Sequence, residues 1–236
     1  MIITYIHHSC FLVETKSCAM IFDYYTDDGS LGEIISKLDK PLYVFSSHFH
    51  GDHFSPQIFK WRGNKADIKY ILSRDILEEG MAQEKDGFFI EKSDIWQDEN
   101  IRVKAYGSTD AGISFYVEAD GFKIFHAGDL NNWHWADEAE EEESKGYETA
   151  YHKELAEISG EIKELDILMF PVDKRLGTDY YKGAEEFIEK IETRAFVPMH
   201  FWKDYESANA FKAVAMKYCK EFFTINKSYE KMEWGE

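Results

Sequence analysis

Short apolar runs, many of them alternating with polar residues, divide the first half of the chain into predicted strands. Strand-length runs bounded by turn-forming residues are typical of β-structure. The runs cover residues 2–6, 10–15, 18–25, 41–47, 68–73, 87–92 and 101–108. Helical spacing is found instead at residues 30–38, at 55–61 and from Asp75 onward.

The second half predicts strands alternating with helices. Residues 111–130 indicate a hairpin that turns at Ala-Asp-Gly, and the acidic residues 136–165 indicate a long solvated helix. Further strands are predicted at 166–172 and 194–201, and further helices at 182–192 and 207–222. Two groups of strands with helices between the later ones predict an α/β (α+β) architecture, in which two mixed sheets pack together under outer helices. We expect residues 1–236 to form a single domain, because no repeat, linker or shift in composition divides them.

Composition and charge exclude several classes of protein. A chain of 236 residues with 44% hydrophobic side chains can form a large core. The net charge of −18 and the absence of a basic cluster argue against a nucleic-acid partner. No apolar run reaches the roughly 18 residues of a membrane helix, and the first residues alternate like a strand rather than a signal peptide. We therefore expect a cytoplasmic protein without a membrane span, and the sequence does not predict its oligomeric state.

The three cysteines do not indicate a disulfide framework or a metal site. Cys10, Cys18 and Cys219 are odd in number and lie at no spacing typical of metal ligands. We expect them to be buried free thiols.

The stretch SSHFHGDHF contains an unusual density of metal-binding side chains directly after a predicted strand. Imidazole nitrogens and carboxylate oxygens are ligands of Zn²⁺ and similar cations. On an extended strand end, His48 and His50 would point to the same side, and a turn at Gly51 would let Asp52 and His53 face a second ion. The alternative is a polar surface turn in which Asp52 caps the next helix.

Two more candidate ligands follow predicted strands later in the chain. Asp129 lies in FHAGDL and His200 in VPMHF. Loops at the carboxyl ends of strands are where open sheets build their sites. Taken alone, Asp129 could cap a helix and His200 could be a packed histidine at the end of a strand.

The order of these motifs resembles the metallo-β-lactamase superfamily. H-x-H-x-D-H, FHAGDL and VPMHF follow one another as in its small bacterial metal-dependent hydrolases, whose first strand carries a histidine-serine pair as HHSC does here. The resemblance covers nearly the whole chain and implies a four-layer αβ/βα sandwich. It also implies a metallo-hydrolase that uses a metal-bound hydroxide on a small ester, lactone or phosphodiester. A catalytically degenerate metal-binding or sensor protein of the same fold is the alternative.

The resemblance also implies roles for individual residues and one or two divalent ions, with Zn²⁺ preferred. The implied ligands are His48 and His50 for the first ion, Asp52, His53 and His200 for the second, and Asp129 as a bridge between them. Asp52 is also the candidate catalytic residue, since it could orient the attacking hydroxide and receive its proton.

One ligand of the family pattern is missing. A further histidine normally precedes the Ala-Gly-Asp motif, but here the stretch reads AYGSTDAG and Gly107 stands in its place. Asp110 could replace that histidine, or it could be a simple turn residue. A carboxylate there would favour Mn²⁺ or Fe²⁺ over Zn²⁺ and would give a weaker first site.

Other histidines match positions near the metals of the resembling family. His8 and His126 are candidates for holding ligands in place, although both could be hydrogen-bonded core residues. His7 has the opposite strand parity to His8 and is expected to lie away from the site.

The expected substrate is a small molecule, and two features bear on its chemistry. The tryptophans of the stretch 133–135 could form one wall of a pocket or pack against the acidic helix. Lys174, Arg175 and Lys203 lie near strand ends and could attract an anionic substrate, or be ordinary surface charges.

Overall fold

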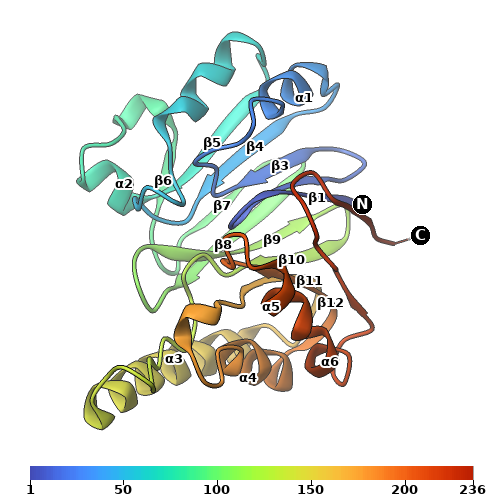
Figure 1. Cartoon of the computed structure of the whole chain (residues 1–236). Coiled ribbons are helices and arrows are strands. Elements are labelled where there is room, and N and C mark those ends of the chain that lie inside the picture. The colour runs from blue at the N-terminus through green and yellow to red at the C-terminus, as the bar shows by residue number, and fades with distance from the viewer. Residues whose placement is uncertain (236) are drawn as a thin grey trace.

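The computed structural model describes residues 1–235, which form two seven-stranded sheets packed face to face (Figure 1). The first sheet contains, in spatial order, β14 (Lys231–Glu233), β1 (Ile2–His7), β2 (Cys10–Glu14), β3 (Ala19–Phe22), β4 (Leu42–Ser46), β5 (Ile68–Ser73) and β6 (Phe88–Ile90). The second contains β13 (Glu221–Phe222), β12 (Glu192–Met199), β11 (Glu164–Pro171), β10 (Phe122–His126), β9 (Ile113–Ala119), β8 (Ile101–Gly107) and β7 (Ile95–Gln97).

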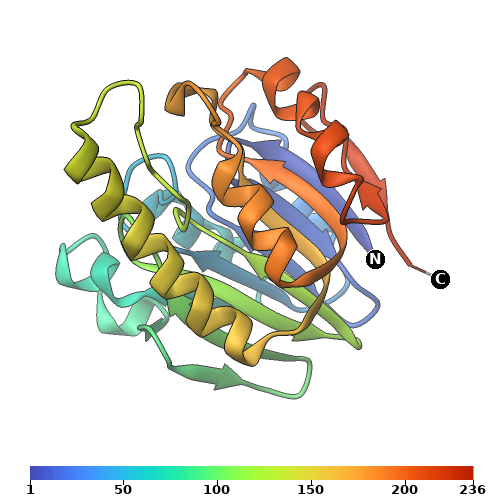
Figure 2. The same cartoon turned by 90° about the horizontal axis from the view of Figure 1, so that it is seen from below.

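Helices cover the outer face of each sheet (Figures 1 and 2). The first sheet is covered by α1 (Leu31–Lys37), α2 (Arg74–Glu78) and a 3₁₀ segment, Pro56–Gly63. The second is covered by α3 (Glu141–Glu161), α4 (Lys182–Lys190), α5 (Tyr205–Ala210) and α6 (Lys212–Ala215). Short 3₁₀ turns lie at Glu84–Asp86 and Lys174–Leu176. The predicted four-layer sandwich of two mixed sheets and outer helices is confirmed.

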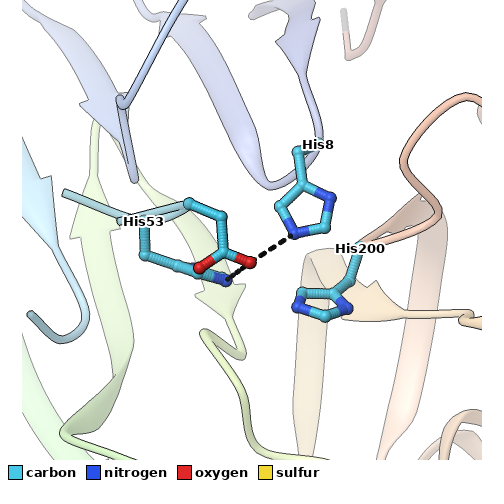
Figure 3. A group of neighbouring side chains, drawn as sticks. His8, His53 and His200 are labelled. Carbon is cyan, nitrogen blue, oxygen red and sulfur yellow. Dashed lines mark ion pairs between the residues drawn. The ribbon is translucent and has the colours of Figure 1, made fainter. Parts of the chain in front are cut away.

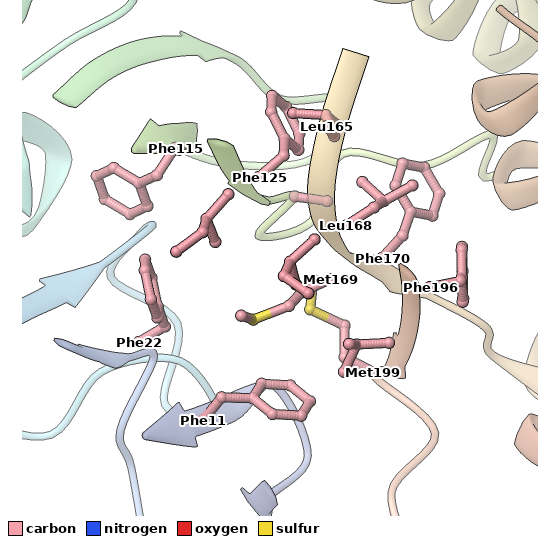
Figure 4. Close-up of a cluster of buried hydrophobic side chains, with 14 of the residues drawn as sticks. Phe11, Phe22, Phe115, Phe125, Leu165, Leu168, Met169, Phe170, Phe196 and Met199 are labelled. Carbon is pink, nitrogen blue, oxygen red and sulfur yellow. The ribbon is translucent and has the colours of Figure 1, made fainter. Parts of the chain in front are cut away.

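The side chains of β4 are buried on both faces of the first sheet. Tyr43 and Phe45 point into the core between the sheets, whereas Leu42 and Val44 point into the core under the helices. This alternation is expected of a parallel strand that is buried on both faces. Figure 4 shows the core between the sheets, where aromatic side chains of the first sheet face methionines of β11 and β12.

The direction of the strands determines where the candidate ligands gather. β3, β4 and β5 are parallel in the first sheet, and β10, β11 and β12 are parallel in the second. The carboxyl ends of parallel strands in an open sheet form its usual binding edge. Among residues 1–235, no helix is both long and apolar enough to cross a membrane.

The predicted elements differ from the observed ones mainly near the C-terminus. The single helix expected at 207–222 is wrong, because the chain forms α5 and α6, turns after Ala215 and then pairs as β13. Phe222 pairs with Phe196 of β12 and stacks on its ring, so sheet pairing replaces the last helical turns. The short strands β7 and β14 were not predicted. All three cysteines are buried free thiols, as expected.

Gly112 links the loop between β8 and β9 to the end of β4. Its φ is +63°, and a Cβ built there would lie 2.0 Å from the Ser47 carbonyl oxygen, which accepts a hydrogen bond from the Ile113 N–H. Gly121, in the hairpin between β9 and β10, has φ +82°, but a Cβ at this position would meet no atom of the described residues within 4 Å.

Replacing these two glycines with alanine separates backbone strain from steric overlap. Gly121→Ala should lower the free energy of unfolding by about 1 kcal/mol, the cost of left-handed backbone. Gly112→Ala should cost more than about 2 kcal/mol, because the backbone of the histidine loop must also move. Urea unfolding measures both values. Equal losses would show that the close approach at Gly112 is not a constraint.

Candidate metal centre

The structure brings together all six candidate ligands at one edge of the two sheets. The residues after β4 are His48, His50, Asp52 and His53, while Asp129 follows β10 and His200 follows β12. β4 ends at Ser46, so His48 and His50 approach each other through a bend rather than through strand alternation, with their ring centroids 4.6 Å apart. Asp52 does not cap the following 3₁₀ segment, because Ser55 does.

Asp129 lies at the centre of the cluster. Its Oδ1 is 3.0 Å from Nε2 of His53 and 3.3 Å from Nε2 of His200, and its Oδ2 is 3.4 Å from Nε2 of His48. The three histidines come from both sheets. One carboxylate therefore faces three imidazole nitrogens of the same kind.

Each of these three imidazoles is anchored through its other nitrogen. Nδ1 of His53 lies 2.7 Å from Asp23, and Nδ1 of His200 lies 2.9 Å from Asp173. Because carboxylates only accept hydrogen bonds, both histidines carry their proton on Nδ1. Carboxylates in this position orient the histidine ligands of metals and fix their tautomer.

His48 is anchored by a hydroxyl group instead. Its Nδ1 lies 3.0 Å from the Ser47 Oγ, which donates its own proton to Asp23 at 2.7 Å. The hydroxyl must then accept from Nδ1–H of His48. In all three histidines Nδ1 is therefore engaged with its anchor, and Nε2 is the nitrogen that points to Asp129.

Sequence reasoning did not identify the two anchoring carboxylates. Asp23 follows β3 directly, Asp173 is the second residue after β11, and both are buried. An acidic residue immediately after a continuous apolar strand, as in AMIFD and MFPVD, was the available signal.

Two further groups of potential ligands surround this centre. Asp110 lies 3.6 Å from His50 and forms a group with His50 and Asp129 whose ligand atoms lie within 4.8 Å of one another. No histidine is present at Gly107, and the space that a side chain would need there is occupied by Glu154. A Cβ built at Gly107 would lie 2.3 Å from the Glu154 carboxylate. The second group joins His8 to Asp52, His53 and His200, and Figure 3 shows the three histidines pointing toward one another.

The charges of the cluster suit a cation. Burial lowers the pKa of His8 to about 3 and that of His48 to about 4, so both are neutral at pH 7. Burial would also lower the pKa of His53, yet Asp129 and Asp23 raise it well above its usual value. Burial opposes the ionisation of Asp129, but His53 and His200 hold its pKa well below the usual range. The carboxylates thus stabilise positive charge at the centre.

Unpaired polar atoms test whether a metal ion fits. Both ring nitrogens of His8, Nε2 of His48 and of His53, and Oδ1 of Asp129 are buried without a hydrogen bond among the described residues. The close contact between His53 and Asp129 lacks hydrogen-bond geometry. Buried polar groups are nearly always paired, and these are nitrogen and oxygen atoms of the kind that hold Zn²⁺, Mn²⁺ or Fe²⁺. The residues therefore fit a divalent cation.

Several residues with strained backbone lie at or beside the cluster. His8, Asp23, His200 and Trp202 all have left-handed φ values, between +45° and +62°. Such conformations are unfavourable for residues other than glycine and occur preferentially at functional sites.

A cavity of about 320 Å³ opens beside the cluster. It is lined by His50, Asp52, Thr109, Asp110, Asp129, Trp133, Trp135, Tyr147, Arg175 and His200. The rings of Trp133 and Trp135 stack with centroids 6.2 Å apart, and the Trp133 indole donates to the Asp129 carbonyl at 2.8 Å. His134 turns away toward the Asp179 carbonyl. The tryptophans therefore form a wall of the cavity, which is one of the two predicted arrangements.

The remaining histidines of interest differ in their surroundings. His126 is fully buried and hydrogen-bonded on both sides, with Nε2 donating to the Ser9 carbonyl and Nδ1 accepting from the Gly128 N–H. It supports the turn that precedes Asp129. His7 contacts Tyr25 and is absent from the three candidate ligand groups, in agreement with its predicted position.

Asp173→Asn should weaken metal binding without unfolding the protein. Loss of the charge that orients His200 is expected to reduce affinity by about 10- to 100-fold. Competition with a chromophoric chelator measures this affinity. Asp166→Asn is the control, because Asp166 is also a buried aspartate paired with an arginine, Arg194 at 3.0 Å, away from the cluster. Equal affinities in the two variants would contradict the role of Asp173.

Comparison with known proteins identifies relatives along most of the chain. Over 213 residues the chain is 26% identical to a "UPF0173 metal-dependent hydrolase" of Natranaerobius thermophilus, which covers 85% of this chain and 83% of that protein. It is also 26% identical over 223 residues to the "UPF0173 metal-dependent hydrolase YtkL" of Bacillus subtilis, with 85% and 86% covered.

A solved structure confirms the fold. Igni18, described as a novel metallo hydrolase from Ignicoccus hospitalis, superimposes with a TM-score of 0.69 over 99% of both chains, at 15% sequence identity. Residues 2–145 also match the family model of the beta-lactamase superfamily domain. The matched segment contains every candidate ligand except His200. The chain therefore belongs to the metallo-β-lactamase superfamily.

Proposed function

We propose that this chain, a metal-dependent hydrolase of the metallo-β-lactamase fold, cleaves small esters, lactones or phosphodiesters. One observation carries the proposal: three anchored histidines direct Nε2 to Asp129 beside an open cavity. The candidate ligands come from both sheets, which supports a single catalytic domain over residues 1–236.

The proposed ligands fall into two groups. They are His48, His50 and Asp110 for one ion, Asp52, His53 and His200 for the other, and Asp129 between them. Ligand atoms of His50, Asp110 and Asp129 lie close together, as do those of Asp52, His53 and His200, whereas those of His48 lie close to His53 and Asp129. A divalent cation held there lowers the pKa of water and polarises the bond to be cleaved. The residues offer nitrogen and oxygen but no sulfur, which is compatible with Zn²⁺, Mn²⁺ or Fe²⁺.

Asp52 is the proposed catalytic carboxylate. It lines the cavity and its side chain is 28% exposed, so it can contact a water molecule beside the substrate. Burial opposes its ionisation, but His8 and His53 lower its pKa, and the carboxylate is charged at pH 7. Asp52 can therefore accept a hydrogen bond from the attacking water, orient it and take its proton.

The cavity favours an anionic substrate. Arg175 is the only arginine or lysine that lines it among the described residues. Its Nε donates to the two carboxylate oxygens of Asp173 at 3.0 and 2.9 Å. Asp173 thereby holds the guanidinium at the cavity rim, and the remaining N–H groups of Arg175 can bind a carboxylate or phosphate. Lys174 lies over the Tyr180 ring, and Lys203 does not line the cavity.

The alternative is a metal-binding or sensor protein without turnover. The absence of a histidine at Gly107 favours it, because the group of His50 and Asp110 is more exposed and richer in carboxylate than the other group. Catalytic turnover separates the two possibilities.

Hydrolysis of matched neutral and anionic chromogenic esters, lactones and phosphodiesters tests the proposed activity. With Zn²⁺, Mn²⁺ or Fe²⁺ added, we expect metal-dependent turnover of at least one class and a preference for the anionic member of the pair.

Asp52→Ala should lower kcat by at least about 100-fold, since the orienting carboxylate is lost. The exposed Asp67→Ala is the control and should retain activity. Full activity of Asp52→Ala would remove Asp52 from the mechanism, and no turnover of any substrate would favour the sensor alternative.

Metal content tests the proposed role of Asp110. Mass spectrometry of the wild-type protein should find two ions per chain, and Asp110→Ala should retain one, because His50 loses its nearest carboxylate partner. Asp67→Ala should match the wild type. Two ions in the Asp110 variant would exclude Asp110 as a ligand. One ion in both proteins would indicate a single site built on Asp52, His53, Asp129 and His200.

A further inference from the structure

His8 is a buried imidazole without a hydrogen-bonding partner. It lies in the turn between β1 and β2 with 0% of its surface exposed, and neither ring nitrogen is hydrogen-bonded among residues 1–235. His126, which is equally buried, has a partner at each nitrogen. Burial of an unsatisfied imidazole is unfavourable, and an apolar side chain would fill the same space at lower cost.

The backbone holds His8 in a fixed orientation over the cluster. Its φ is +54°, its N–H donates to the Tyr5 Oη at 2.9 Å, and its carbonyl accepts from the His200 N–H at 3.3 Å. The ring of His8 consequently lies 4.2 Å from that of His200, between centroids. A strained position that is fixed by two hydrogen bonds indicates a requirement for this side chain at this place.

The ring of His8 faces the other candidate ligands. Its Nε2 is 3.4 Å from Oδ2 of Asp52, without hydrogen-bond geometry, and its ring centroid is 5.5 Å from that of His53. One atom from each of His8, Asp52, His53 and His200 lies within 4.8 Å of the others (Figure 3). Nitrogen and oxygen atoms this close together can reach a single small cation.

We propose that His8 is a further protein ligand of the ion held by Asp52, His53 and His200. The inference rests on the ligand assignment of the proposed function and goes beyond it, because it adds a residue and distinguishes the two ions. Together with Asp129, these four residues would close this site, whereas catalytic sites keep a position open. The open position then belongs to the other ion, near His50 and Asp110.

The distribution of histidines supports the distinction between a closed ion site and one with an open position. The histidine missing at Gly107 leaves one group short, and its space is taken by Glu154. His8 adds an imidazole to the other group. In the first group the side chains of His50 and Asp110 are 36% and 52% exposed and only His48 is buried. In the other group those of His8, His53 and His200 are 0%, 0% and 4% exposed, and Asp52 is 28% exposed. The buried group should therefore retain its ion, and the exposed group should exchange its ion with solvent.

Cobalt(II) chloride is the probe for this division, because it reports ligands by absorption without any need for turnover. The wild-type protein loaded with cobalt should keep one ion per chain after dialysis against a chelator that removes the other. In His8→Asn, which retains a residue tolerant of left-handed backbone, the retained ion should bind at least about tenfold more weakly. His7→Asn, the neighbouring control, should behave as the wild type.

His8→Cys provides a direct reading of contact with the ion. A thiolate at position 8 that binds cobalt should produce a thiolate-to-cobalt charge-transfer band in the near ultraviolet, absent from the wild type and from His7→Cys. This band decides the question if His8→Asn fails to fold. Cobalt retention unchanged in His8→Asn together with no band in His8→Cys would overturn the inference while leaving the proposed function intact. Failure of the wild type to bind cobalt would overturn both.

Discussion

The carboxylate of Asp23 is the interaction on which the candidate metal centre depends. It is completely buried and accepts hydrogen bonds from the Ser47 N–H and Oγ, each at 2.7 Å, and from Nδ1 of His53. β3 and β4 are parallel with Phe22 opposite Phe45, so Asp23 and the residues after β4 leave the sheet side by side. Three donors offset the cost of burying this charge. In return, the carboxylate fixes the orientation of His53 directly and of His48 through Ser47.

The second sheet repeats this arrangement with different residues. Asp173 follows β11 and anchors His200, which follows the neighbouring parallel strand β12. Each sheet thus contributes a buried carboxylate that holds a histidine by Nδ1 and leaves Nε2 directed to Asp129. Left-handed backbone and unpaired polar atoms at the same edge cost stability, and the hydrophobic core between the sheets supplies the compensation.

The sequence predicted the architecture better than the details of the site. Apolar runs and turn residues indicated most strands, because burial on one or both faces is visible in local patterns. β7 and β14 were missed because short edge strands depend on their partners more than on their own residues. The membership in the superfamily, expected from the motifs, is confirmed.

The contacts of the site could not be predicted in the same way. Asp23 and His53 are 30 positions apart and meet only through the pairing of strands, and His8 meets His200 across the interface of the two sheets. The assignments of His48, His50, Asp52, His53, Asp129 and His200 as ligands stay predictions. Their convergence on one carboxylate is the geometric argument for them.

Anomalous diffraction at a metal absorption edge, from crystals grown with Zn²⁺ or Mn²⁺, tests the central claim most directly. We predict a peak in contact with the Asp129 carboxylate and with Nε2 of His53 and His200. The absence of any peak there, with Asp129 hydrogen-bonded directly to a protonated His53, would contradict the assignment of this cluster as a metal centre.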